Sequence, residues 1–123
     1  MHHYIGFFVS KYKAVKVKVD GIKFDSKGEA EYYKHLLNQE KKGVLKILEL
    51  QPKTYLTESR ILYKPDFLIL RDDREIYIDF KGIETPVFKL KKKLWKNYGL
   101  GILWLVKKSK LYFEVYEQIK KDC

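Results

Sequence analysis

Two apolar segments separated by a short polar turn constrain the fold of this chain more than any other feature. They lie within residues 62–70 and 75–81, and the sequence Arg-Asp-Asp-Arg stands between them. Short segments rich in β-branched and aromatic residues and bounded by aspartates are typical of strands in a β-hairpin. Because the two strands of a hairpin run back along each other, we expect their far ends to lie side by side.

Periodicity and capping residues predict the other elements. Valines alternate with lysines over residues 15–19 before Asp20-Gly21, which predicts a basic strand, a two-residue turn and a short return strand. Ser26 and Glu29 have the spacing of a capping box at a helix start. The remaining expected elements are helix 27–42, a strand over about 45–57 interrupted near Gln51-Pro52, helix 85–98, a buried strand at 101–106, and a tail at 112–121 that suits a strand leading into a short helix.

This order predicts an α/β fold with a mixed central sheet flanked by two helices and an N-terminal basic β-hairpin. The chain has 123 residues, 46% of them hydrophobic, which suits one soluble globular domain. Its formal charge of +10 favours a polyanionic partner such as nucleic acid. The apolar runs are too short for a membrane span or a secretory signal. We therefore expect no membrane association and a cytoplasmic location, in the host cell if the protein is viral.

The cysteine and the histidines of this sequence are not arranged for a disulfide or a zinc site. Cys123 is the only cysteine, so it cannot form an internal disulfide. None of the histidines has neighbours at the spacing of zinc ligands; they are His2, His3 and His35. A zinc site is therefore not expected.

The far ends of the predicted hairpin carry two acids and a lysine. Asp79 and Lys81 are two residues apart and so share one face of their strand, while Asp66 begins the other strand directly after Pro65. Strand pairing would bring Asp66 toward Asp79. A simpler interpretation leaves Asp66 at the end of a loop and makes Asp79 and Lys81 a solvated ion pair, which contributes only ~0–1 kcal/mol.

The first helix carries a third acid on its apolar face. At about 100° per residue, Tyr33 and Leu36 lie beside Glu29, whereas Glu31 points to the opposite side. A buried carboxylate needs a partner or becomes protonated. The backbone N–H of Ser26 could be that partner in a capping box, or Glu29 could belong to a functional site.

The second helix carries a lysine on its apolar face. The expected face consists of Val87, Leu90, Leu94, Trp95 and Tyr98. Lys91 falls within this stripe, whereas the other lysines of the helix fall outside it. Lys91 could extend along the edge of the core to water, or it could point a cation at a phosphate near Asp79.

Three carboxylates at one end of a sheet repel one another unless a cation lies among them. Mg²⁺ takes oxygen ligands, usually one or two carboxylates with waters and phosphate oxygens. A divalent ion with a lysine beside it can activate a water and offset the charge that develops on a phosphoryl group. The set of residues therefore favours phosphodiester hydrolysis.

The motif Pro-Asp at 65–66 followed by Asp-Phe-Lys at 79–81 resembles the core motif of the PD-(D/E)xK nuclease superfamily. Further segments resemble, in order, a family of small phage-encoded nucleases of this superfamily: VDGIKFDSKGEAEYYKHL, LQPKTYL, YKPDF, YIDFKGIETPVFKLKKKL and YG. The resemblance covers about residues 11–106. Those nucleases are related in core design to phage endonuclease I and other Holliday-junction resolvases.

The resemblance implies a restriction-endonuclease-like core and assigns roles within it. Glu29, Asp66 and Asp79 would hold Mg²⁺ or Mn²⁺, with the Phe80 carbonyl as a further ligand. Lys81 would be the catalytic lysine. The residues expected to contact DNA are Gln51, Thr85 and Lys91, which match positions of the phage family, and the lysines Lys16, Lys18, Lys89 and Lys92 of the basic strand and second helix.

The same resemblance suggests the organisation of the chain and its partners. Residues 25–106 would form the catalytic core of a single domain, with an arm and hairpin at 1–24 and a C-terminal extension at 107–123. Related enzymes are homodimers, so we expect a homodimer. The apolar segment near the start could be exchanged between protomers, or it could pack on its own domain.

Three functions from different classes follow from these observations. The leading hypothesis is a metal-dependent DNA endonuclease, selective for DNA structure and acting in phage recombination, replication or packaging. The alternative is a nuclease-fold accessory protein that binds nucleic acid without cutting it. A basic protein of membrane surfaces is the third, although the lysine-rich helix also carries many core residues.

Overall fold

The computed structural model describes the backbone of residues 4–9 and 15–121 and the side chains of residues 17–121. The predictions about His2, His3 and Cys123 fall outside these residues, as does the side chain of Lys16. Among the described residues, neither helix has the length and hydropathy to cross a lipid bilayer.

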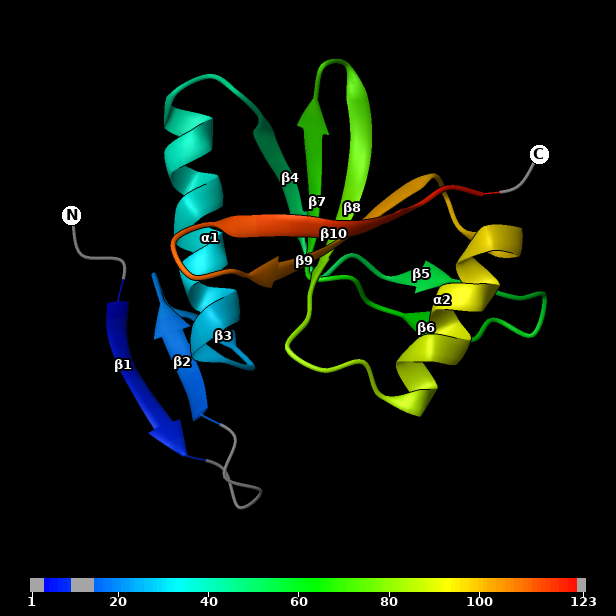
Figure 1. Ribbon diagram of the computed structural model, residues 1–123, viewed down its shortest axis with the longest axis horizontal. Coiled ribbons are helices and arrows are strands. Elements are labelled where there is room, and N and C mark those ends of the chain that lie inside the picture. Colours follow the sequence, from blue (N-terminus) through cyan, green and yellow to red (C-terminus); the bar gives the residue numbers. More distant parts are fainter. Residues whose placement is uncertain (1–3, 10–14, 122–123) are drawn as a thin grey trace.

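A mixed five-stranded sheet forms the centre of the molecule (Figure 1), in the order β10-β9-β8-β7-β4. Its strands are β4 (Lys46–Leu50), β7 (Phe67–Arg71), β8 (Arg74–Phe80), β9 (Ile102–Lys108) and β10 (Phe113–Ile119). Strands β8 and β9 are parallel and are joined by helix α2 (Pro86–Tyr98), whereas the other neighbouring strands are antiparallel. The mixed sheet and the two helices agree with the predicted α/β class.

The remaining elements lie around this sheet. They are the three-stranded sheet of β1 (Tyr4–Val9), β2 (Val15–Val19) and β3 (Ile22–Phe24), helix α1 (Lys27–Lys41), and the two-stranded ribbon of β5 (Thr54–Tyr55) and β6 (Leu62–Tyr63). Strand β1 pairs with β2 of the same chain. The N-terminal segment is therefore an edge strand of the three-stranded sheet in this chain.

Both predicted hairpin turns are present. Asp20 and Gly21 have φ angles of 51° and 81°, and Asp72 and Asp73 have φ angles of 51° and 61°. Positive φ at both central residues suits the right-handed twist of a hairpin, and Asp and Gly tolerate it better than most residues. The β2–β3 and β7–β8 hairpins are therefore specified by local sequence.

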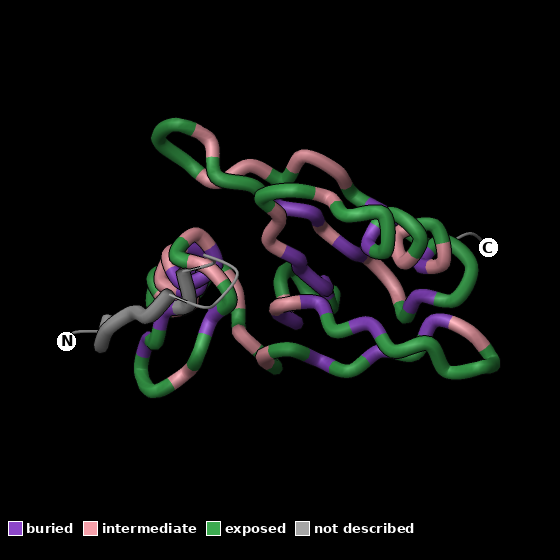
Figure 2. The backbone as a smooth tube through the Cα atoms, turned by 90° about the horizontal axis from the view of Figure 1, so that it is seen from below, coloured by how far each residue is buried: buried purple, intermediate pink, exposed green. Residues whose placement is uncertain are grey.

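The two helices cover opposite faces of the central sheet. Ile76 and Ile78 belong to the core that contains α1, whereas Tyr77 belongs to the core that contains α2. Successive side chains of β8 thus alternate between the two cores. In Figure 2, buried residues gather along the strands and at α1, while the turns at the periphery are exposed. The end of β8 is therefore a place where both cores meet.

The predicted strand over residues 62–70 is wrong as a single element. The structure divides it into β6 and β7, with Pro65 between them, and β6 pairs with β5 rather than with the central sheet. Proline lacks the N–H that a continuous ladder needs, which explains the break. In the tail, residues 113–119 form β10, and the predicted short helix is not present in the described residues.

The predicted apolar face of the second helix is also wrong in part. Trp95 is buried and Leu94 half-buried as expected, but Phe88 is buried as well. Three residues of the predicted face are mostly exposed instead: Val87 at 63%, Leu90 at 56% and Tyr98 at 45%. Phe88 and Trp95 pack in the core between α2 and the sheet, where large aromatic rings bury much apolar area.

Candidate catalytic site

The pairing of β7 with β8 brings Asp66 next to the end of β8. Phe67 pairs with Ile78, so one step further along each strand lie Asp66 and Asp79. The backbone N–H of Phe80 donates a hydrogen bond to Asp66 Oδ2 at 2.7 Å. The structure therefore brings together the two aspartates that the sequence places thirteen positions apart, roughly one hairpin length.

Asp79 is buried and makes two side-chain contacts through one oxygen. The Tyr63 hydroxyl donates a short hydrogen bond to Asp79 Oδ2, and the Lys81 ammonium lies 3.2 Å from the same atom. Lys81 Nζ also lies 4.1 Å from the centre of the Phe88 ring, a cation–π distance. The lysine is thus held between an aspartate and an aromatic ring.

Asp66 lies between the other two acids. Burial raises the pKa of Asp66 well above its usual 3.8, and hydrogen bonding with Glu29 and the charge of Asp79 raise it further. A raised carboxyl pKa means that the charged form lacks sufficient positive partners. The three acids therefore form a cluster whose negative charge the described side chains only partly offset.

Glu29 enters this cluster from the first turn of α1. Its backbone N–H donates to the Ser26 side chain at 3.0 Å, which caps the helix. Its Oε2 accepts a hydrogen bond from the backbone N–H of Asp25 at 3.0 Å, one residue earlier than the capping-box partner considered from the sequence. The carboxyl group is buried, and it also contacts Asp66. The capping interpretation and the site interpretation of Glu29 are therefore compatible.

The close approach of α1 to β8 depends on a glycine. A Cβ atom added to Gly28 would lie 2.7 Å from the Phe80 ring. The ring of Phe80 therefore rests on the helix backbone beside Glu29, and any side chain at this position would displace it. This contact fixes the distance between the first-helix acid and the Asp79-Phe80-Lys81 segment.

A cavity of about 390 Å³ opens beside the aspartates. Asp66, Asp79 and Lys81 line it, together with Thr85 and Lys91 of the α2 segment. Lys91 is half-buried, and its Nζ lies 6.0 Å from the centre of the Tyr63 ring. Its position at the cavity agrees with the second interpretation of Lys91, in which the cation faces the site.

Within the part of the chain that the structure describes, no group of three or more His, Cys, Asp or Glu side chains is arranged as a ready-made metal site. Each of the three acids has one oxygen bonded to a protein donor instead. The donor chemistry nevertheless fits a hard divalent cation, since three neighbouring carboxyl groups share one ammonium, which lies beside Asp79. Side-chain rotation would be needed to turn these oxygens toward one ion.

The remaining residues predicted at the site differ in position. The Thr85 hydroxyl accepts from the backbone N–H of Phe88 at 3.1 Å, so it caps α2 while lining the cavity. Gln51 is exposed, and its backbone N–H donates to the Asp66 carbonyl at 2.8 Å. Lys18 and Lys89 are exposed on β2 and α2. All four remain on the surface, where contact with a substrate is sterically open.

Lys92 is engaged by the protein itself. Its Nζ lies 2.8 Å from Glu84 Oε1 and 3.0 Å from Glu117 Oε1. The Tyr116 hydroxyl donates to Glu84 Oε2 at 2.6 Å. Together these residues form what we call the Lys92 cluster, and they attach the segment after Lys81 to α2 and β10. The prediction that Lys92 is available to DNA does not account for these contacts.

Tyr63 is the site residue that sequence reasoning missed. In one continuous strand it would lie on the same face as Phe67, away from Asp66. The break at Pro65 reverses this, and Tyr63 packs in the α2 core against Phe88 and Trp95 at ring distances of 6.1 and 5.9 Å. Pro65 was the signal in the sequence that side chains would not alternate regularly between faces from Tyr63 to Phe67.

Comparison with known proteins gives one family. No curated protein matches the chain. A family model described as "Protein of unknown function (DUF1064)" matches residues 9–120, a range that contains the three acids, Lys81 and Tyr63. The match covers nearly the whole sequence, and the chain therefore belongs to the DUF1064 family.

Proposed function

We propose that the protein is a metal-dependent nuclease that hydrolyses phosphodiester bonds in DNA. The observation that carries the proposal is the position of Asp66 between Glu29 and Asp79, together with the Lys81 ammonium 3.2 Å from Asp79 Oδ2. Burial and the neighbouring acids raise the pKa of Asp66, which is costly for stability, so the presence of three acids with one lysine at a cavity favours a functional role. The PD-(D/E)xK character of the core is part of the same proposal.

The acids and the lysine would have different roles. Glu29, Asp66 and Asp79 would hold Mg²⁺ or Mn²⁺, and the Phe80 carbonyl lies in the same segment as a further oxygen donor. When bound, such an ion supplies an acidified water and positive charge near the scissile phosphate. Lys81 faces the cavity, where its ammonium would hold the attacking water or a phosphate oxygen.

Several features around the cavity support an anionic, extended substrate. The chain carries a formal charge of +10, and Lys64, Lys81 and Lys91 line the cavity. Contacts from lysines to phosphates do not depend on base sequence. We therefore propose selection by DNA structure, in the manner of junction-resolving enzymes, with Lys18, Lys89 and Lys91 contacting the backbone. A homodimer would supply the second active site that symmetric cutting requires.

The test is a cleavage assay on supercoiled, single-stranded and four-way-junction DNA with Mg²⁺ or Mn²⁺. Wild-type protein should cut at least one substrate, chelator should stop the reaction, and Asp79→Ala should be inactive. Equal cleavage by wild type and Asp79→Ala would overturn the proposal. Salt-sensitive DNA binding without cleavage under any metal would instead support the non-catalytic accessory function.

A further inference from the structure

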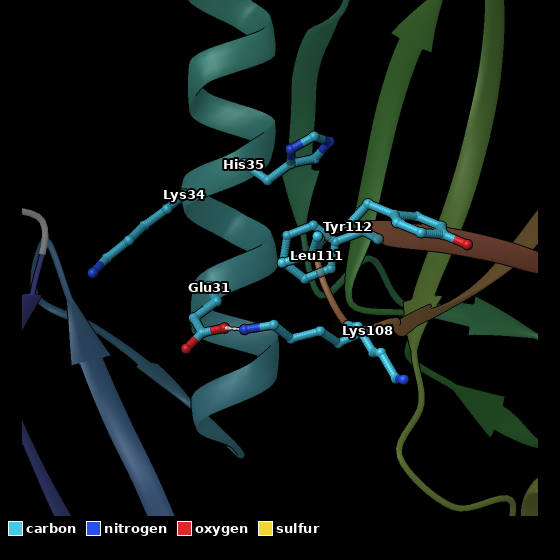
Figure 3. A pocket seen from close by; sticks show the side chains of 8 residues that line it. Glu31, Lys34, His35, Lys108, Leu111 and Tyr112 are labelled. Carbon is cyan, nitrogen blue, oxygen red and sulfur yellow. Dashed lines mark hydrogen bonds and ion pairs between the residues drawn. The ribbon is translucent and has the colours of Figure 1, made fainter.

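A second cavity lies on the α1 side of the sheet, between α1 and the turn that joins β9 to β10 (Figure 3). Its volume is about 570 Å³, and it is lined by residues from both elements. None of the residues assigned to the carboxylate site lines it. It therefore needs an explanation of its own.

The charges that line this cavity favour an anion. Lys34, Lys108 and Lys110 contribute three cations, and Glu31 contributes one carboxylate. Lys108 extends across to α1 and forms an ion pair with Glu31, as Figure 3 shows. That pair is internally neutral, and Lys110 adds a further positive charge to the lining of the cavity. A phosphate group is the anion that best matches a basic protein of this type.

The rim of the cavity offers apolar and aromatic surface to solvent. Leu111 is 95% exposed and Tyr112 is 59% exposed, both in the turn after β9. The Phe113 and His35 rings lie beneath them with centres 5.2 Å apart. An exposed aromatic ring next to lysines is the arrangement on which unpaired bases stack while their phosphates are neutralised.

The floor of this cavity is continuous with the proposed catalytic site. The ring centres of Phe113 and Phe80 are 6.2 Å apart, and those of Tyr32 and Phe80 are 6.0 Å apart. The Phe80 backbone N–H in turn holds Asp66. One layer of rings therefore connects the base of the cavity to the residue whose backbone N–H holds Asp66.

We propose that this cavity binds an unpaired stretch of the DNA strand adjacent to the cleaved phosphate. Tyr112 stacks on an unpaired base, and Lys110 contacts a neighbouring phosphate. A paired base in a continuous duplex presents no free face to Tyr112, so the cavity favours DNA with single-stranded segments. This inference rests on the proposed nuclease function for its substrate, but its binding test is independent of cleavage.

Fluorescence anisotropy with a labelled oligodeoxythymidine, measured in chelator, tests the proposal. Removing one stacking ring typically lowers affinity by about tenfold, which is the loss expected for Tyr112→Ala. Tyr112→Phe keeps the ring and should bind within about twofold of wild type. Tyr98→Ala, which removes another exposed tyrosine from α2, is the matched control and should bind normally. Lys110→Met should reduce the slope of log affinity against log salt concentration by about 1, the change expected for the loss of one phosphate contact.

Crosslinking locates the strand directly. A 5-iodouracil oligonucleotide should crosslink to the peptide that contains Tyr112, and Tyr112→Ala should lose that product. Unchanged affinity of Tyr112→Ala, or crosslinks that map only to other segments, would overturn the inference. The proposed nuclease function fails by a different result, namely absence of metal-dependent cleavage by the wild-type protein.

Discussion

Two charged clusters of the molecule differ in how their charges are matched. In the carboxylate site, Glu29, Asp66 and Asp79 meet one lysine, and burial raises the pKa of Asp66 well above its usual value. In the Lys92 cluster, hydrogen bonding to Lys92 lowers the pKa of Glu84. The environment of Asp66 therefore disfavours its charged form, whereas the environment of Glu84 favours it.

The difference separates a structural role from a functional one. The Lys92 cluster ties the loop after Lys81 to α2 and β10, and complementary charges suffice for that. The carboxylate site gains no such benefit, since like charges held together lower the stability of the fold. We propose that a bound cation or substrate offsets the repulsion between the acids of the carboxylate site.

The largest expected effect concerns Lys81. Lys81→Met removes the ammonium beside Asp79 without removing an oxygen donor, so Mn²⁺ binding should persist while DNA cleavage falls by about 100- to 1,000-fold. Single-turnover cleavage and calorimetric Mn²⁺ titration measure the two quantities separately. Full cleavage by Lys81→Met would contradict a catalytic role for Lys81. The lysine of the carboxylate site would then be structural, like Lys92.

The next effect concerns Tyr63. Tyr63→Phe removes the hydroxyl that holds Asp79 Oδ2, and loss of a partner that orients a metal ligand typically lowers metal affinity by about 10- to 100-fold. Raised metal concentration should then restore cleavage, because the acids themselves remain. Tyr116→Phe, which removes the equivalent hydroxyl from Glu84, is the control and should leave the metal dependence unchanged.

Stability should respond in opposite directions at the two clusters. Because the folded-state pKa of Asp66 lies above its unfolded value, folding takes up a proton between those two values, and stability in chelator falls as the pH rises through that interval. Asp66→Asn removes this loss and should stabilise the metal-free protein by roughly 1 kcal/mol in mildly alkaline buffer. Urea unfolding at several pH values measures the gain, which should shrink in acid. A destabilised Asp66→Asn would show that the acid cluster supports the fold.

The smallest effect is expected for Lys92. Lys92→Met should lower the free energy of unfolding at neutral pH by about 0.5–1 kcal/mol, because it breaks two partly exposed ion pairs. The folded-state pKa of Glu84 lies below its usual 4.5, so this contribution is present above that value and is lost as the pH falls through the folded-state pKa. Thermal unfolding at neutral and acid pH measures the difference. Weakened DNA binding with unchanged stability would favour the prediction that Lys92 contacts DNA.

Local signals in the sequence predicted the elements well, because each depends on a few neighbouring residues. The turns at Asp20-Gly21 and Asp72-Asp73 and the helix starts at Ser26 and Thr85 are specified in this way. The pairing of two strands through a tight turn also predicted that Asp66 and Asp79 would meet. These features require no knowledge of distant parts of the chain.

Features that depend on tertiary packing were not predictable in the same way. The α2 face was assigned by counting apolar residues, yet Phe88 and Trp95 face the sheet and leave Val87 exposed. The contact of Tyr63 with Asp79 depends on the break at Pro65, which sends β6 into a separate ribbon. Gly28 gave no signal in the sequence, because its role is visible only when the Phe80 ring lies against it.

The most direct test of the central claim is the thermal stability of the metal-free protein measured during Mn²⁺ titration. Wild-type protein should show a midpoint that rises with Mn²⁺ and saturates, because a cation bound among Glu29, Asp66 and Asp79 relieves their repulsion. The double variant Asp66→Asn/Asp79→Asn should show no rise, because it lacks two of the three acids. The account would be contradicted if the wild-type midpoint did not change with Mn²⁺. It would also be contradicted if Mn²⁺ raised the midpoint of the double variant as much as that of the wild type.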